Sequence, residues 1–251
     1  MSQSFKRGVM ILDLFSAERP VLTLDEIAAE VQISPITAYR YVKVLSEAGI
    51  LILDERRVYL SAKILRFVNL FWQQDHLAAL AKESISILAH ELNETIALCK
   101  LEANDVVCIY AVESSLTLRT TFSIGERMPI YSGAFSRTIA AFLPERELKS
   151  IIQHTKWIPH TESTIVDSHE FHLRLDRIRQ DGYDISNGEV ESGVVALAVP
   201  ILVSGQIKGS LGLAIPSVRY SPDETTSIIG RMQEVSQHIS KELEKHELLN
   251  K

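Results

Sequence analysis

The residues best suited to chemistry near the start of the chain are hydroxyl and basic side chains between positions 34 and 57. In a helix over this segment, Arg40 and Lys43 lie opposite the apolar face, with Thr37 and Tyr39 on the flanks. Arginine and threonine can hydrogen-bond base edges in the major groove of DNA, and lysine or tyrosine can hold phosphates. The candidate DNA-contacting residues are Ser34, Ile36, Thr37, Tyr39, Arg40, Lys43, Arg56 and Arg57.

Helix signals around this segment predict how these side chains are positioned. Thr23 and Glu26 have the spacing of a capping box, which begins a helix. Ser34 is a suitable N-cap, Pro35 fits the first helical position, and Gly49 can end that helix in a left-handed conformation. The apolar positions of the three predicted helices are Phe5, Val9 and Leu12, then Leu24, Ile27, Ala28 and Val31, then Ala38, Tyr41, Val42 and Leu45.

A predicted hairpin follows the third helix directly. Two apolar runs, 50–53 and 58–60, flank a charged turn over 54–57. A hairpin in this place would be a wing, with Arg56 and Arg57 at its tip beside the DNA backbone or the minor groove. Three helices and a hairpin also fit a protein-docking module whose basic residues are simply solvated, and this segment alone leaves both interpretations open.

The composition is that of an ordinary globular protein. The chain has 251 residues, of which 46% are hydrophobic and 23% charged, which excludes disordered, collagen-like and disulfide-scaffold classes. No apolar run is long enough for a membrane span, and the first residues lack a signal peptide, so we expect a cytoplasmic protein with no membrane partner. The net charge of −6 is uneven, at +1 over residues 1–74 and −7 over 75–251, which suggests different partners for the two parts.

Two apolar helical stretches follow the hairpin. Each could pack on the chain's own body or form the seam of a dimer. We favour the dimer seam for at least part of them, because a palindromic operator is most simply read by a two-fold dimer. The stretches comprise Ile64, Leu65, Val68, Leu70, Phe71 and Trp72, and then Leu77, Leu80, Ala81, Ile85, Leu88 and Leu92.

The rest of the chain predicts antiparallel strands flanked by helices, which is an α+β body. Strands over 95–100 and 106–112 would form a hairpin whose two-residue loop pairs Cys99 with Cys108. A redox switch is conceivable there, but buried reduced thiols are favoured. Further strands are predicted over 194–203 and 207–215, followed by a long terminal helix that opens near Ser221.

The N-terminal segment resembles the DNA-binding domain of IclR-type bacterial transcription regulators. The family favours Ser-Thr-x-x-Arg-Leu in its recognition helix, and here Ile36 replaces the serine and Tyr41 the leucine. The resemblance implies a winged helix-turn-helix that binds double-stranded operator DNA as a homodimer or homotetramer. It rests on the run Leu22-Thr23-Leu24-Asp25-Glu26-Ile27-Ala28, the run Ile33-Ser34-Pro35-Ile36-Thr37-Ala38-Tyr39-Arg40-Tyr41-Val42-Lys43-Val44-Leu45, and Gly49-Ile50-Leu51.

The body resembles the effector-binding half of the same family, which has a GAF-like fold. The matching segments are 125–134, 182–184, 189–194 and 198–201, together with Gly205. The resemblance implies an α+β protein in which a winged helix-turn-helix is joined by a linker helix to a GAF-like antiparallel-sheet effector domain. The implied boundaries are 1–62 for the DNA-binding domain, 63–80 for the linker helix and 81–251 for the effector domain.

The resemblance also implies a small-molecule effector, bound by a small-residue loop and by later strands. Ser136-Arg137 departs from the Gly-Lys pair that usually follows this loop. Three of the four strand positions lack a side-chain hydrogen-bonding group, so we expect a roomier, more apolar pocket and an aromatic or larger organic acid. The same loop residues fit a purely structural turn nearly as well. The candidate effector residues are Tyr131, Gly133, Ala134, Phe135 and Arg137, with Ser186, Ala196, Gly212 and Ala214 on the strands.

Patterns that would indicate catalysis are missing. The sequence has neither a phosphate-binding glycine motif nor a nucleophile elbow. His154, His160, His169 and His172 cluster in sequence, but a zinc site needs three or four convergent ligands, so a solvated polar segment is favoured and we expect no metal and no cofactor. We predict a ligand-responsive DNA-binding transcription regulator. The alternatives are a small-metabolite enzyme with an accessory N-terminal domain, and an adaptor without salt-dependent DNA binding.

Overall fold

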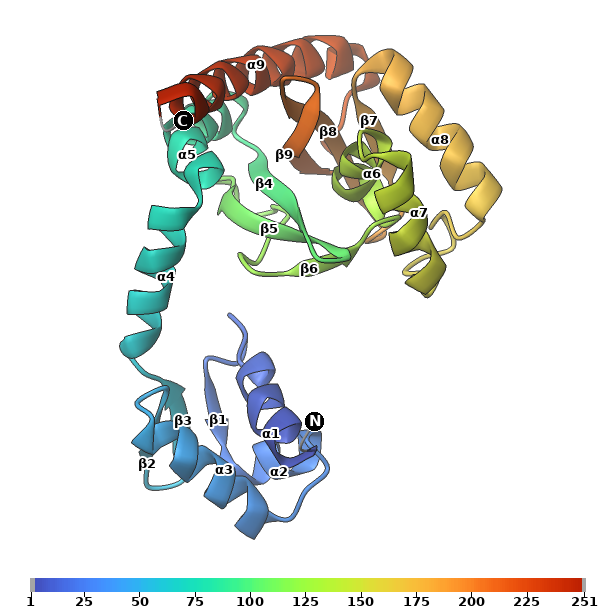
Figure 1. Ribbon diagram of the computed structural model, residues 1–251. Helices are drawn as coiled ribbons and strands as arrows, with labels where there is room; N and C mark the ends of the chain where they lie inside the picture. The colour runs from blue at the N-terminus through green and yellow to red at the C-terminus, as the bar shows by residue number, and fades with distance from the viewer. Residues whose placement is uncertain (1–2, 250–251) are drawn as a thin grey trace. The chain divides into compact units, whose positions relative to one another are not determined.

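The computed structural model describes residues 3–249 and forms two compact units that divide between Gln74 and Asp75 (Figure 1). The predicted DNA-binding domain begins at residue 1 and the predicted effector domain ends at residue 251. Residues 1–2 and 250–251 lie outside the described residues. The division falls inside the predicted linker, because helix α4 (Lys63–Gln74) ends there and α5 (His76–Leu92) begins at once. The Asp75 carboxylate caps α5 by accepting the Ala78 amide at 2.9 Å, so 63–80 is two helices rather than one.

In the N-terminal unit, three α-helices and a small antiparallel sheet of order β1-β3-β2 precede α4. The capping box at Thr23 and the N-cap at Ser34 are both formed, and Gly49 is left-handed after the third helix, as predicted. The predicted hairpin is β2–β3, and β1 is a third strand that was not predicted. The elements are α1 (Gln3–Met10), a 3₁₀ turn (Leu12–Leu14), β1 (Val21–Thr23), α2 (Leu24–Glu30), α3 (Pro35–Glu47), β2 (Leu51–Asp54) and β3 (Arg57–Leu60).

The core of this unit lies between α2, α3 and the sheet. Ala38 and Val42 of α3 are fully buried against Ile27 and Leu22, as the helical periodicity predicts. The predicted stripe of α1 is different, because Phe5 and Val9 are 68% and 44% exposed. The periodicity of α1 therefore indicates a helix correctly but marks a face that this unit does not bury.

The C-terminal unit is built on a six-stranded antiparallel sheet of order β6-β5-β4-β9-β8-β7. Its strands are β4 (Thr95–Glu102), β5 (Asp105–Val112), β6 (Arg127–Pro129), β7 (Asp184–Asn187), β8 (Val194–Val203) and β9 (Gln206–Pro216). Its other helices are α6 (Gly133–Ala141), α7 (Glu145–His154), α8 (Ser168–Asp181), a 3₁₀ turn (Pro222–Glu224) and α9 (Thr225–Leu249).

The predicted pairing of the two cysteines is confirmed. Cys99 of β4 lies opposite Cys108 of β5, and both are buried free thiols. Burial raises the pKa of the Cys99 thiol well above its ordinary value, and the Cys108 thiol raises it further. A thiol held in its neutral form is a poor nucleophile, so Cys99 acts as a small apolar side chain, and Cys108 is buried beside it in the same core.

Helices cover both faces of the sheet (Figure 1). Helices α5 and α9 pack together on one face, where the second predicted apolar stretch is buried, including Leu77, Ile85 and Leu88. Helix α6, backed by α8, packs on the other face. The second stretch therefore belongs to the unit's own core. Between residues 3 and 249, the structure has no helix that is both apolar enough and long enough to cross a membrane.

Candidate nucleic-acid interface and effector cavity

The exposed face of α3 carries most of the predicted DNA-contacting side chains. Ile36 and Tyr39 are 75% and 45% exposed, and Arg40 and Lys43 also project into solvent. Arg40 forms no ion pair with any residue that the structure describes, whereas Lys43 lies 3.9 Å from the Glu47 carboxylate one turn later. An exposed pair at this distance contributes little, so Lys43 can exchange its partner for a phosphate.

The start of α3 is held by two hydroxyl groups. Ser34 Oγ accepts the Thr37 amide at 3.2 Å and lies 2.9 Å from Thr37 Oγ1. Thr37 is half-buried, so its hydroxyl is committed in part to the cap. Ser34 and Thr37 thus fix the first turn of the helix that presents Arg40.

The two arginines of the hairpin differ. Arg56 lies in the turn between β2 and β3, and its Nη2 is 2.8 Å from the Asp25 carboxylate of α2. Arg57 begins β3, is exposed, and forms no ion pair within the described part of the chain. Because the Arg56 pair is largely exposed, it costs little to break, and both arginines remain available to an anionic partner.

A cavity of about 100 Å³ lies in the C-terminal unit between the start of α6 and the sheet. It is lined by six of the nine predicted effector residues, namely Gly133, Ala134, Phe135, Ser186, Ala196 and Ala214. Residues that were not predicted complete its lining, and they are Thr120, Thr121, Phe122, Glu126, Met128, Ser132, Val190, Glu191 and Val194. Six of these, Glu126, Met128, Ser132, Val190, Glu191 and Val194, lie in the segments 125–134 and 189–194 that carry the resemblance, whereas Thr120, Thr121 and Phe122 had no signal.

The predicted small-residue loop is in fact the first turn of helix α6. Ser132 is its N-cap residue but makes no side-chain capping hydrogen bond, so the first-turn amides of α6 are left for another acceptor. Ser132 and Thr120 both line the cavity, and their hydroxyls are buried with no hydrogen-bond partner among the described residues. Helix N-termini with free amides and hydroxyl donors are suited to binding an oxyanion.

Two of the predicted effector residues, Tyr131 and Gly212, do not line this cavity. The Tyr131 hydroxyl accepts the Ile158 amide and donates to the Ile158 carbonyl, both at 2.9 Å, so it ties down a neighbouring segment. A Cβ on Gly212 would lie 2.2 Å from Cε1 of Phe135. The space that a glycine leaves here is filled by the Phe135 ring, and the expectation of a roomier pocket is wrong at this position.

Arg137 also lies outside the cavity lining. It is fully buried on α6, where Nε donates to Asp184 at 2.8 Å and the Nη atoms donate to both Glu189 oxygens, Nη2 at 3.0 Å. Burial lowers the pKa of the guanidinium, but the charges of Asp184 and Glu189 outweigh this and raise the pKa above its usual value. Because both carboxylates already neutralise it, Arg137 does not offer a free charge to an effector.

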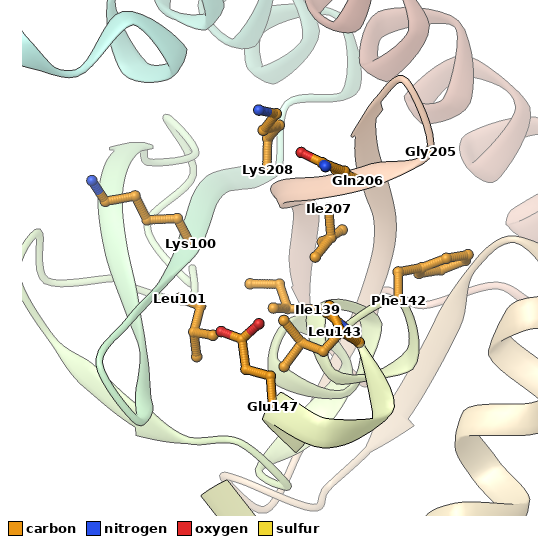
Figure 2. Close-up of a pocket in the computed structure, with 11 residues that line it drawn as sticks. Lys100, Leu101, Ile139, Phe142, Leu143, Glu147, Gly205, Gln206, Ile207 and Lys208 are labelled. Atoms are coloured by element: carbon orange, nitrogen blue, oxygen red, sulfur yellow. The ribbon is translucent and has the colours of Figure 1, made fainter. Parts of the chain in front are cut away.

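A larger groove of about 660 Å³ lies at the other end of α6 (Figure 2). No predicted site residue lines it. The Glu147 side chain points toward its apolar floor, whereas the ammonium groups of Lys100 and Lys208 point away (Figure 2). Those lysines pair with Asp75 and Glu247, respectively.

The histidine cluster does not converge on a common point. His154 and His172 each form a hydrogen bond through Nδ1 to a backbone carbonyl one turn earlier in their own helices, that of Ser150 and that of Ser168, respectively. Among residues 3–249, no group of three or more histidine, cysteine or carboxylate side chains is arranged to hold a metal ion. Spacing in the sequence therefore did not translate into proximity of ligands.

Both units match models of one protein family. Residues 4–55 match the IclR helix-turn-helix domain, and residues 71–241 match the C-terminal domain of the bacterial transcriptional regulator IclR. Together these matches cover the unit that presents α3 and the unit that holds the cavity.

Named relatives agree with this assignment. The transcriptional regulator KipR of Bacillus subtilis is 27% identical over 94% of this chain and 95% of its own. The p-hydroxybenzoate hydroxylase transcriptional activator of Acinetobacter baylyi is 29% identical over 78% of this chain and 74% of its own. An IclR homologue from Microbacterium hydrocarbonoxydans, solved as a complex with 4-hydroxybenzoate, shares the fold with a TM-score of 0.79 at 19% identity, covering 96% of this chain and 99% of that one. These matches support a regulator and give no support to an enzyme. The chain belongs to the IclR family of bacterial transcriptional regulators.

Proposed function

We propose that this regulator binds a palindromic operator in the cytoplasm as a dimer, or as a tetramer of two dimers, by inserting α3 into the major groove. The observation that carries the proposal is the exposed face of α3, where Arg40 projects with no competing carboxylate in the described chain. Arginine can donate two hydrogen bonds to one guanine, which makes it the most effective reader of base edges. Lys43, Arg57 and Arg56 would then hold phosphates on either side.

The apolar face of α4 supports the dimer. None of its residues is buried within the described chain, and Leu65, Phe67, Val68 and Leu70 are each at least 40% exposed. Soluble proteins seldom leave so many large apolar side chains of one helix in water. A second copy of the same helix is the partner we propose, because a two-fold axis here would present two α3 helices to two half-sites.

Leu65→Glu is expected to weaken the dimer at least tenfold, because a carboxylate would be buried in the seam without a partner. Gln73→Glu places the same charge on an exposed polar position of α4 and is the matched control. Sedimentation velocity over a range of concentrations measures both dissociation constants. Equal constants for the two variants, or a wild type that stays monomeric, would rule out α4 as the seam.

We further propose that the cavity at α6 binds the effector and that unit 75–251 is a GAF-like sensor domain. Phe122 and Phe135 lie 4.9 Å apart by ring centroids and form an aromatic wall. The uncapped start of α6 and the Ser132 and Thr120 hydroxyls are donors that suit one carboxylate, whereas the two acidic residues of the lining, Glu126 and Glu191, are exposed. At about 100 Å³ the cavity has room for a small ligand rather than a large one, and its two aromatic rings lead us to narrow the proposed effector to an aromatic monocarboxylic acid.

Two of the proteins compared above carry the same chemistry in their names. One is an activator for p-hydroxybenzoate hydroxylase, and the other was solved with 4-hydroxybenzoate. These are properties of those proteins, and they support testing benzoates first.

Calorimetry is expected to show binding of 4-hydroxybenzoate or benzoate and weaker binding of pyruvate and glyoxylate. Ser132→Ala removes one hydroxyl donor from the cavity lining and should weaken benzoate binding a few-fold.

A mobility-shift assay with DNA upstream of the protein's own gene cluster, with and without the acid, tests whether the acid changes DNA binding. Tight binding of pyruvate or glyoxylate would overturn the aromatic assignment, and no preference over random DNA would overturn the operator assignment.

A further inference from the structure

A buried ion-pair cluster connects α6 to the loop between β7 and β8. Arg137 of α6 pairs with Asp184 and Glu189, and Arg174 of α8 donates to Asp184 at 2.6 Å. The side chains of Arg137 and Asp184 are fully buried, and that of Glu189 is 11% exposed. Two cations and two carboxylates balance, so the cluster has no charge left for a ligand.

The loop that Glu189 belongs to, residues 188–193, forms one wall of the effector cavity, and we call it the cavity loop. Its Val190 and Glu191 line the cavity. A Cβ on Gly133, the first residue of α6, would lie 2.7 Å from Cγ2 of Val190, so the loop packs directly on the start of that helix. The wall is therefore positioned by the contact between this loop and α6.

Backbone hydrogen bonds also hold the cavity loop in place, among them those from the Ser217 amide to the Gly193 carbonyl at 2.7 Å and from the Val194 amide to the Glu191 carbonyl at 3.2 Å. Its two end residues, Gly188 and Gly193, are glycines with positive φ, and both can change conformation more easily than other residues. Thr161 Oγ1 donates to the Gly188 carbonyl and Thr164 Oγ1 to the Glu189 carbonyl, both at 2.6 Å. Only one side chain within the loop, that of Glu189, forms an ion pair with the described residues, and its partner is Arg137.

We propose that Arg137 is a positioning residue for the effector cavity: by binding Glu189 it clamps the cavity loop against α6 and slows the entry and exit of the effector. Arg137 does not touch the effector. The proposal rests on the proposed effector site, because it assigns a gate to that site. It also explains why Arg137, which lies on the helix whose first turn lines the cavity, does not line the cavity itself and instead pairs with both Asp184 and Glu189.

The test uses the full-length protein and Glu189→Gln, which keeps the shape of the side chain but removes the charge. The Gly188 amide donates to the Val194 carbonyl at 2.8 Å and so reports opening of the loop by hydrogen exchange. We expect roughly tenfold faster exchange in a peptide spanning 184–195, because glutamine lacks the negative charge and one of the two acceptor oxygens that bind the Arg137 guanidinium, with exchange in 95–102 unchanged. Dissociation of 4-hydroxybenzoate should accelerate by a similar factor.

Two further variants separate a clamp from general destabilisation. Glu191→Gln changes a carboxylate of the same loop that forms no ion pair in the described chain, and it should leave exchange at wild-type rates. Arg137→Lys keeps the charge but loses the two-pronged contact, so it should give an intermediate rate. Wild-type exchange in Glu189→Gln, or equal acceleration in Glu191→Gln, would overturn the clamp. If the wild type bound no benzoate, but Glu189→Gln still exchanged faster than the wild type, the effector class would be overturned and the clamp supported.

Discussion

Replacing Arg40 by alanine is expected to weaken operator binding by about 5- to 150-fold, which corresponds to about 1–3 kcal/mol for a bidentate contact to a base. The structure leaves this guanidinium exposed on α3 and unpaired within the described residues, so no intramolecular bond has to break before it reaches DNA. The loss should fall mainly on the operator and much less on random DNA, because random sequences do not offer the matched base.

Lys43→Ala is the matched control on the same helix face. A phosphate contact carries no sequence information, so this variant should weaken operator and random DNA alike and lower the salt dependence by about one counterion. Binding of both variants to operator and random DNA, titrated at several salt concentrations, gives affinity, specificity and slope together. Unchanged operator affinity in Arg40→Ala would remove Arg40 from the reading face of α3.

The N-terminal unit could be predicted closely because its signals are local. A capping box at Thr23, a cap at Ser34 followed by proline, and Gly49 each act within one turn of their own helix. The apolar periodicity of α3 then fixes which side chains face solvent. The partners of exposed side chains could not be predicted in this way. Arg56, for example, pairs with Asp25, which lies 31 positions away in the sequence.

The effector cavity was harder to predict because its walls meet only after folding. Small residues at 132–134 favour a loop by propensity, yet tertiary packing makes them the start of α6. An arginine beside a cavity suggests a ligand for an acid, but the partners of Arg137 lie 47 and 52 positions away and neutralise it. The role of Thr120 depends on a segment with no motif at all, so no local pattern could have found it.

Gly212→Ala is expected to abolish effector binding and to lower the free energy of unfolding of the C-terminal unit by about 1–3 kcal/mol, the usual cost of overpacking a core. The added methyl would meet Cε1 and Cζ of Phe135 at 2.2 and 2.4 Å, closer than any real contact, so the ring must move. Phe135 lines the effector cavity, and a ring displaced from β9 has that cavity as its nearest free space. The substitution should therefore destabilise the fold, and the displaced Phe135 ring should fill the binding site.

A double-mutant cycle isolates this clash. Phe135→Ala alone leaves a void and should cost about 3–5 kcal/mol, but adding Gly212→Ala to it should cost little more, because the ring it would strike is gone. Gly230→Ala on α9 is the control, since its Cβ meets nothing within 4 Å and alanine should stabilise that helix by about 0.5–1 kcal/mol. Urea unfolding followed by Trp157 fluorescence, in a Trp72→Phe background, reports the C-terminal unit alone. If the two substitutions were simply additive, Phe135 would not be the group that Gly212 accommodates, and the small size of the cavity would need another cause.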